Sequence, residues 1–300
     1  MTKKIQALVF AGASVLFVVL IVHAGVHGLI ENLISARWAI GPSVLAWGLV
    51  YVCNTIAWRT LLDNAIPFGR AYAISIASFA INYVTPLVSL GGEPFRLAAA
   101  SAWVDAPRAT ASVVGFRVIH TIGQLIFWIT AIPLAFYLLP RSPATTASLI
   151  TLTVIFTGLS LALLALFRSD IRIFRRWPKV DKIHEQLTAY SRRAIVIAVI
   201  AEYVGRCFSM LEYLFITRAL GLNVDYPTAF MIGAFSQFVT NATFFIPFEL
   251  GSKEASLSLI FGLLGLPADL GVYASIVSRI REMIWIAIGL TSMWAARRRA

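Results

Sequence analysis

Charged side chains and thiols are both scarce in this sequence. Only 13% of its 300 residues are charged, and only 14 residues are acidic. A chain so poor in charge does not have the composition of a water-soluble domain of this length. The two cysteines, Cys53 and Cys207, lie in separate apolar stretches, which excludes a disulfide framework or a cysteine metal cluster. We therefore predict no disulfide-stapled fold and no metal site.

Motifs that bind nucleotides or activate a nucleophile are also absent. The sequence has no Walker loop, no glycine-rich dinucleotide fingerprint and no Gly-x-Ser-x-Gly elbow. His23 and His27 are four residues apart, but no carboxylate partner completes a metal set with them. No polar stretch is long enough to form a soluble nucleotide-binding domain. We expect no ATP-driven step, no cofactor and no enzymatic activity.

Apolar residues dominate the composition instead. Hydrophobic residues make up 59% of the chain, and the mean hydropathy is +0.81. A helix needs about 20 mostly apolar residues to cross a bilayer. Several runs reach this length, at residues 5–30, 38–62, 109–139, 144–167, 194–220 and 268–294. The sequence therefore predicts an all-α integral membrane protein, a polytopic helix bundle.

Basic residues exceed acidic ones by 11, and their positions predict an orientation. They gather at residues 3–4, in the loop 168–193 and at residues 297–299. Because basic residues favour the cytoplasmic side of a membrane, we place all three clusters and both termini there, and we expect no nucleic-acid partner. This orientation puts 16 of the 25 basic residues inside and three outside. The other six lie within apolar segments: Arg96, Arg117, Arg206, Lys253, Arg279 and Arg281.

Two further apolar segments, 71–106 and 226–266, are interrupted by helix-breaking residues. Proline lacks a backbone donor and stops a helix, whereas glycine permits a chain reversal. We predict helix breaks at five positions: Pro86, Gly91, Gly92, Pro247 and Gly251. Each segment is thus expected to form a helix, a reversal and a second helix.

The interrupted segments belong to a longer internal repeat. Matched residues recur at offsets of 159 to 162: Arg59 with Arg218, Pro67 with Pro227, Glu93 with Glu254, and Arg117 with Arg279. The shorter helical arms would reach only about 20 Å, less than the roughly 30 Å thickness of the hydrocarbon core. Counting sides along the chain makes one segment start and end inside and the other start and end outside. We predict two inverted repeats, 1–140 and 141–300, containing the re-entrant hairpins 71–106 and 226–266.

Charged residues near these breaks are the candidate substrate-binding groups. An ionised side chain at the bilayer centre costs roughly 2.5–3.5 kcal/mol, so such groups need partners or water. We select Glu93, Arg96, Arg117, Glu254 and Arg279. Each arginine in the following span could hold the carboxylate of its own hairpin, or bind a lipid phosphate in fork geometry. Ser252 is a candidate N-cap for the second helix of the second hairpin.

A second group of residues is placed for coupling to a proton or another ion. It consists of Glu93, Glu254, His120 and Glu202. Glu202 and Arg206 are four residues apart, which puts them on one face of a helix. That spacing favours a packing salt bridge over a proton relay, and both readings remain open at this point.

Three features of the sequence carry a resemblance to a known family. They are the residues Gly-Gly-Glu-Pro-Phe-Arg at 91–96, the pattern Ile246-Pro247 followed by Gly251 and Glu254-Ala255, and the arginine after each motif. The chain resembles the transmembrane flippase-like family, related to the membrane half of lysylphosphatidylglycerol synthases. The resemblance covers nearly the whole chain and implies lipid movement between leaflets of the inner (cytoplasmic) membrane. At Lys253 the sequence departs from the family motif, which carries an arginine. No synthase domain lies within these residues, so lipid synthesis is not implied.

We therefore expect a transporter that moves a lipid between leaflets without ATP, coupled to an ion or proton gradient or to none. The lipid would be a phospholipid, a modified phospholipid or an isoprenoid of the hopanoid type. Membrane lipids are the expected partners, with a lipid-synthesising enzyme as a further one. The alternatives are an integral membrane enzyme that modifies lipids, and a scaffold that recruits a lipid synthase through the basic loop 168–193.

Overall fold

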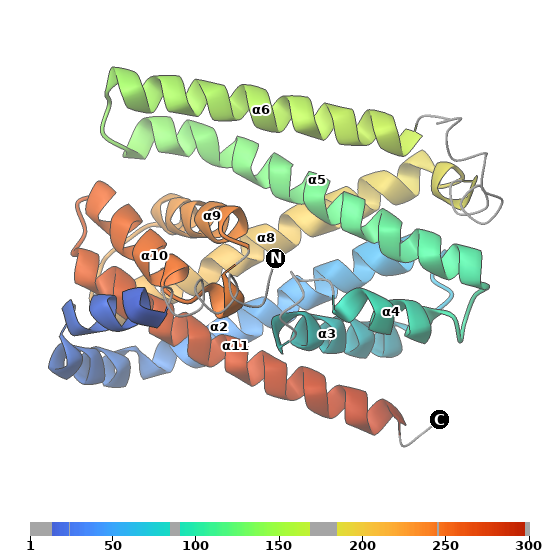
Figure 1. The fold of residues 1–300 in the computed structure, drawn as a ribbon, viewed down its shortest axis with the longest axis horizontal. Helices are drawn as coiled ribbons and strands as arrows, with labels where there is room; N and C mark the ends of the chain where they lie inside the picture. Colours follow the sequence, from blue (N-terminus) through green and yellow to red (C-terminus); the bar gives the residue numbers. More distant parts are fainter. Residues whose placement is uncertain (1–13, 24, 85–90, 169–184, 245, 298–300) are drawn as a thin grey trace. The chain divides into compact units, whose positions relative to one another are not determined.

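The computed structural model describes residues 14–23, 25–84, 91–168, 185–244 and 246–297, and within these ranges the regular structure is helical. The main helices are α2 (Val26–Leu61), α3 (Phe68–Val84), α4 (Gly92–Ala100), α5 (Ala106–Leu138), α6 (Pro143–Arg168), α8 (Arg192–Ala219), α9 (Tyr226–Ala242), α10 (Ser252–Leu263) and α11 (Ala268–Arg297), with a short 3₁₀ turn η2 (Pro247–Glu249) between α9 and α10 (Figure 1). No strand occurs in the described ranges, so the all-α prediction is confirmed there.

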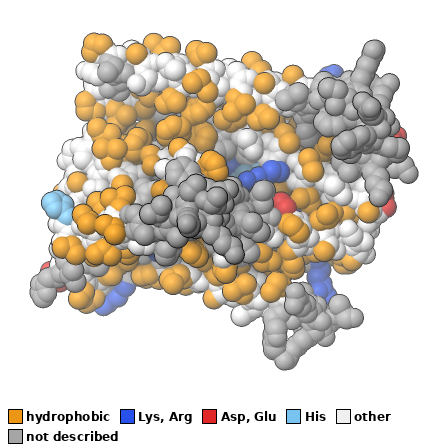
Figure 2. Space-filling model, in the orientation of Figure 1, with side chains coloured by type: hydrophobic (Ala, Val, Ile, Leu, Met, Phe, Trp, Pro, Cys, Tyr) orange, Lys and Arg blue, Asp and Glu red, His pale blue; other side chains and the backbone are white. Residues whose placement is uncertain are grey.

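Long apolar helices with exposed hydrophobic side chains mark this chain as membrane-embedded. Four described helices are long and apolar enough to cross a bilayer: Ile30–Leu61 within α2, α5, Thr146–Leu163 within α6, and α8. Large apolar side chains such as Leu45 and Val154 are 74% and 67% exposed. Such exposure is unfavourable in water but not in lipid. Hydrophobic side chains also cover much of the described surface in Figure 2, with only small basic and acidic groups among them.

The first two predicted spans have different boundaries in the structure. A short apolar helix covers Ser14–His23, and α2 then runs without interruption from Val26. The polar stretch that the sequence analysis placed between two spans is therefore helical. Within it, the amide of Asn32 donates to the carbonyl of Gly28 at 2.8 Å and the hydroxyl of Ser35 donates to that of Glu31 at 3.0 Å. These bonds satisfy polar side chains within the helix itself.

The last predicted span corresponds to α11, a helix of 30 residues. It is long enough to cross a bilayer at 1.5 Å per residue. It is not among the four helices counted above as apolar enough to cross, because Arg279, Arg281 and Glu282 lie near its middle. The partners of these three side chains form a large part of the candidate site.

The chain divides into two compact units, each assembled from separated segments. Unit 1 comprises residues 1–47, 131–149 and 208–284, and unit 2 comprises residues 48–130, 150–207 and 285–300. Each unit contains one of the interrupted segments. The prediction of repeats at 1–140 and 141–300 concerns a symmetry between sequence halves, and it stays a prediction.

In unit 1, α9 and α10 pack against each other as the second hairpin (Figure 1). Asp225 caps α9 by accepting a hydrogen bond from the backbone of Thr228 at 2.9 Å. The hydroxyls of Ser236 and Ser256 lie 3.1 Å apart between the two helices. Gly271 of α11 lies so close to the backbone of Leu257 that a Cβ atom there would be 2.5 Å from its carbonyl oxygen. Small side chains thus bring α11 against α10.

In unit 2, α3 and α4 form the first hairpin. The N–H of Gly92 donates to the side chain of Asn82 at 2.7 Å, which ties the start of α4 to the end of α3. A Cβ atom at Gly92 would overlap the carbonyl of Ser78. The hydrophobic core of this unit includes Trp58 and Phe116, and both rings also contact a site residue.

The helix breaks fall in the segments where the sequence analysis placed them. Helix α3 ends at Val84 and α4 begins at Gly92, while α9 ends at Ala242 and α10 begins at Ser252. Pro86 lies outside the described residues. Pro247 begins η2, Gly91 and Gly251 are the N-cap residues of α4 and α10, and Gly92 is the first residue of α4. The depth of these breaks in a bilayer, and hence their re-entrant character, stays a prediction.

Candidate functional site

The second hairpin is centred on the buried ion pair between Glu254 and Arg279. Glu254 is fully buried in the first turn of α10, and Arg279 reaches it from α11. The guanidinium contacts Oε1 through Nε at 2.8 Å and Oε2 through Nη2 at 3.0 Å. Ser275 donates to the same carboxylate at 3.1 Å, and the N–H of Gly251 donates at 2.8 Å. Every oxygen of Glu254 is therefore hydrogen-bonded, as a buried carboxylate requires.

The N-cap of α10 is one residue earlier than predicted. Gly251 occupies the cap position, and the side chain of Glu254 accepts from its backbone as in a capping box. Ser252 is the first helical residue, and its hydroxyl donates to the carbonyl of Glu249 at 3.1 Å. The prediction of Ser252 as N-cap was wrong because glycine, unlike serine, readily adopts the φ of +74° found at Gly251.

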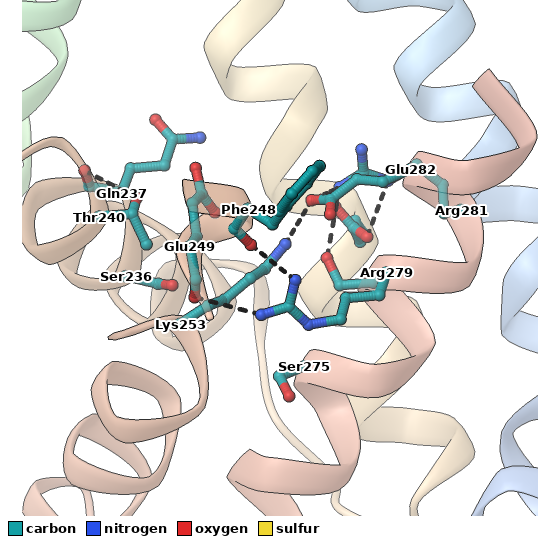
Figure 3. Close-up of polar contacts among 12 residues, drawn as sticks. Ser236, Gln237, Thr240, Phe248, Glu249, Lys253, Ser275, Arg279, Arg281 and Glu282 are labelled. Carbon is teal, nitrogen blue, oxygen red and sulfur yellow. Dashed lines mark hydrogen bonds and ion pairs between the residues drawn. The ribbon is translucent and has the colours of Figure 1, made fainter. Parts of the chain in front are cut away.

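Arg279 also fixes the turn that precedes α10. Its Nη1 donates to the carbonyl of Phe248 at 2.9 Å, and its Nη2 donates to that of Glu249 at 3.1 Å (Figure 3). Phe248 and Glu249 have φ values of +56° and +52°, in the left-handed region that non-glycine residues rarely enter. Each such residue costs of order 1–3 kcal/mol. The arginine thus binds a carboxylate and stabilises a strained backbone at once.

A second set of buried charges in unit 1 continues from this pair. Lys253 of α10 forms an ion pair with Glu282 of α11. Arg281 binds Glu212 of α8 in bidentate geometry, at 3.0 Å and 2.8 Å. The indole of Trp47 donates to Glu212 at 2.7 Å, and its ring lies 3.9 Å from the Arg281 guanidinium carbon. An arginine between a carboxylate and an aromatic face is stabilised on both sides.

The corresponding pair of the first hairpin is looser and more accessible. Arg117 of α5 approaches Glu93 of α4 at 3.5 Å, at the limit of a hydrogen bond. The side chains of Arg117 and Glu93 are 46% and 25% exposed. The second carboxylate oxygen of Glu93 is buried and has no hydrogen-bond partner among the described residues. Among the described residues, this pair leaves one Glu93 oxygen without a partner and gives Arg117 a single contact with the carboxylate.

Arg96 does not pair with Glu93, although the two are three residues apart on α4. Its side chain is buried, and the guanidinium carbon lies 4.9 Å from the ring of Trp58 and 4.3 Å from that of Phe116. Its Nε has no hydrogen-bond partner in the described part of the chain. The arginine is thus held by two aromatic faces, and within the described ranges its Nε donor is not engaged.

Glu202 is the centre of a fully hydrogen-bonded group in unit 2. Its buried carboxylate accepts from Arg206 at 2.9 Å and from Asn54 at 3.0 Å, and Nδ1 of His120 lies 2.7 Å away. Arg206 also donates to Gln124 at 2.9 Å and to the backbone of His120 at 2.8 Å. The structure thus contains the salt bridge that the spacing of Glu202 and Arg206 favoured. A role for Glu202 or His120 in coupling stays a prediction.

The charged residues around the two hairpins form two sets whose net charges have opposite signs. We call Glu212, Glu249, Glu254, Glu282, Lys253, Arg279 and Arg281 the second-hairpin network; it holds four carboxylates and three cations. We call Glu93, Glu202, Arg96, Arg117 and Arg206 the first-hairpin network; it holds two carboxylates and three cations. The first network can therefore accept an anion, and the second can accept a proton or another cation.

The sequence predicted the five binding residues as one set, and in the structure they belong to two different units. Glu93, Arg96 and Arg117 belong to unit 2, and Glu254 and Arg279 belong to unit 1. Two residues of the site carried no signal in the sequence: no spacing rule singles out Glu249, and Trp47 reads as one more apolar residue. Glu282 and Arg281 were detectable as charges inside an apolar run, but their partners were not.

Comparison with known proteins gives one match. The family model described as the lysylphosphatidylglycerol synthase TM region matches residues 5–289, nearly the whole chain. No curated protein and no solved structure matches the chain. The match agrees with the four long apolar helices, and together they indicate a multi-pass membrane protein.

Proposed function

The chain belongs to the lysylphosphatidylglycerol synthase TM-region family, and from this premise we propose that it is a transporter that moves a lipid between the leaflets of a membrane. The family name ties this membrane region to an aminoacylated phospholipid. The substrate proposed here is a lipid with an anionic headgroup, either a phospholipid or a modified phospholipid. The movement needs no ATP, and the protein acts as a carrier rather than as an enzyme.

The observation that carries this proposal is the positive excess and incomplete bonding of the first-hairpin network. Arg117 is nearly half exposed and contacts Glu93 at only 3.5 Å. A lipid phosphate presents several oxygens to a planar arginine fork and would give Arg117 shorter contacts than Glu93 does. Arg96 adds a second positive charge, with a free Nε donor among the described residues. A headgroup bound here would balance the charge of the network while the acyl chains stay in lipid.

The predicted topology supports the same function. Inverted repeats with broken helices are a recurrent plan of secondary transporters, and their substrate sites lie where the helices break. The two helix breaks of this chain each adjoin a glutamate that contacts an arginine of the next long helix. We propose that both hairpins are re-entrant, that the membrane is the inner membrane, and that both termini lie in the cytoplasm. A hopanoid without an anionic headgroup is less suited, because a neutral ring system offers no phosphate or carboxylate for Arg117 to bind.

The test is lipid movement in proteoliposomes made with labelled anionic phospholipid. Arg117→Ala should reduce the rate of leaflet exchange at least about tenfold, because losing a charge-assisted bidentate contact costs about 1.5–3 kcal/mol. Arg117→Lys keeps the charge but not the fork and should recover part of the rate. Arg108→Ala is the matched control, since Arg108 is an α5 residue that pairs with Asp63 outside the site.

Two results would contradict the proposal. Lipid exchange at the wild-type rate in Arg117→Ala would contradict the proposed binding site. The absence of exchange in wild-type protein with any anionic lipid would contradict the proposed transport function. Chemical turnover of the lipid by the purified protein would favour an enzyme instead.

A further inference from the structure

Glu249 differs from every other carboxylate of the two networks. Its backbone is held firmly: the N–H donates to the carbonyl of Ile246 at 3.3 Å, and its carbonyl accepts from Arg279 and from Ser252, both at 3.1 Å. Its carboxylate, in contrast, makes no hydrogen bond or ion pair with any described residue. The side chain is only partly exposed. The nearby cations Lys253, Arg279 and Arg281 each form an ion pair with another carboxylate, so none of these described ion pairs belongs to Glu249.

The local backbone shows that this placement is costly. Glu249 and Phe248 both adopt left-handed conformations at φ of +52° and +56°, a region where glycine would carry no steric penalty. Strained backbone of this kind persists where surrounding contacts enforce it, and it concentrates at functional sites. Here the enforcing contacts come from Arg279, which binds the carbonyls of both residues. The turn therefore presents the Glu249 side chain at an energetic cost.

The charges around Glu249 are already balanced against each other. Lys253 of α10 pairs with Glu282, Arg279 pairs with Glu254, and Arg281 pairs with Glu212 of α8 (Figure 3). These groups, with Tyr213 of α8 beside Lys253, are the titratable and charged side chains that face the turn. With three pairs complete, Glu249 is the one carboxylate of the second-hairpin network left over. Its ionised form gives the network a net negative charge.

We infer that Glu249 is a proton-binding site that couples lipid transport to the proton gradient, an inference that rests on the proposed transport function. A proton from the aqueous phase binds a carboxylate oxygen and forms an O–H bond, which makes the network neutral. Release of that proton to water restores the carboxylate and the negative charge. A proton fits better than a metal ion, because a proton needs one carboxylate oxygen, whereas a metal ion needs several ligands and the described residues hold no group of three or more that could supply them.

Infrared difference spectroscopy on the reconstituted protein tests the proton site without reference to transport. Spectra at acidic and alkaline pH should differ by a carboxyl band of the partly buried Glu249, distinct from the band of the carboxyl groups exposed to water. Glu249→Gln should lose this band, and Glu249→Asp should shift it. Glu31→Gln is the matched control, because Glu31 is an exposed carboxylate of α2 and its removal should leave the band unchanged. Retention of the wild-type band in both Glu249 variants would overturn the inference.

Lipid exchange under an imposed pH gradient tests the coupling. The gradient should change the rate in wild-type liposomes, and Glu249→Gln should lose this response. A response to sodium at constant pH, in place of a response to protons, would also overturn the inference. If the band depends on Glu249 but wild-type protein moves no lipid, the proposed function fails and the proton site stands. If lipid moves and the band does not depend on Glu249, the proposed function stands and the proton site fails.

Discussion

The two hairpins place a similar pair of residues in different chemical states. In both, a glutamate in the first turn of the second helix contacts an arginine of the next long helix. Around Glu254 the contacts are short and bidentate, and both oxygens are satisfied. Around Glu93 the contact is 3.5 Å, and one oxygen has no described partner. A repeated motif thus specifies which residues meet but not how tightly they bind.

The difference arises from the neighbours of each pair. In the second hairpin, the turn at Phe248 and Glu249 directs two carbonyls at Arg279 and completes its hydrogen bonds. In the first hairpin, the described contact of Arg117 with Glu93 is a single one, and Arg96 turns toward aromatic rings instead of the carboxylate. We infer from this contrast that the second site is chiefly structural and proton-binding, and that the first is open to ligand.

Arg279→Ala should have the largest effect on stability. It leaves Glu254 buried without its cation and removes two hydrogen bonds from a strained turn, so we expect a loss of about 3–5 kcal/mol. Arg117→Ala should cost less than about 1 kcal/mol, because that pair is partly exposed. Thermal or denaturant unfolding of the detergent-solubilised protein measures both. Equal losses in the two variants would show that the hairpins do not differ as the contacts indicate.

The aromatic support of Arg96 should have an intermediate effect. Phe116→Leu removes one ring from the guanidinium, and the loss should be about 0.5–2 kcal/mol beyond the packing cost. A double-mutant cycle with Arg96→Met isolates this coupling energy from the change in packing. A coupling energy near zero would mean that the stacked geometry does not stabilise the cation, and that the first hairpin holds Arg96 by other contacts.

A small effect should come from the cap of α9, where Asp225 is the N-cap residue, whereas Pro67 is the residue directly before α3. Asp225→Ala should cost about 1 kcal/mol, and Asp225→Asn much less, because Asn also caps a helix. Hydrogen bonds from the side chain and backbone of Thr228 lower the pKa of Asp225. The cap's contribution is therefore present above the unfolded-state pKa and is lost as pH falls through the lower folded-state value. Unfolding measured at acidic and neutral pH should show this loss in wild-type protein and not in Asp225→Asn.

Much of the fold could be read from local sequence. The apolar runs predicted the long helices, and prolines and glycines predicted the interruptions between α3 and α4 and between α9 and α10. The boundary between the first two spans was wrong, because the polar stretch within α2 satisfies its side chains by bonds to the preceding turn. Hydropathy does not show that outcome, since it counts these side chains as polar whether or not they are hydrogen-bonded within the helix.

The candidate site was only half predictable for a related reason. Spacing of three or four residues on one helix identifies pairs such as Glu202 with Arg206. Arg96 fails the same rule, because two rings from α2 and α5 compete for it more effectively than Glu93 does. The partners of Arg281 come from segments that are distant in the chain, and Trp47 and Glu212 are 165 residues apart.

The amino-acid sequence by itself determined that this chain is helical, apolar enough for a membrane, and broken at two matched points. These properties follow from hydropathy and from backbone chemistry, which act over a few residues. Only the tertiary structure decided which charges are paired and which lack an ion-pair partner in the part of the chain that it describes, as at Arg96 and Glu249. The physical reason is that an ion pair depends on distances of a few ångströms between different helices, and packing alone sets those distances.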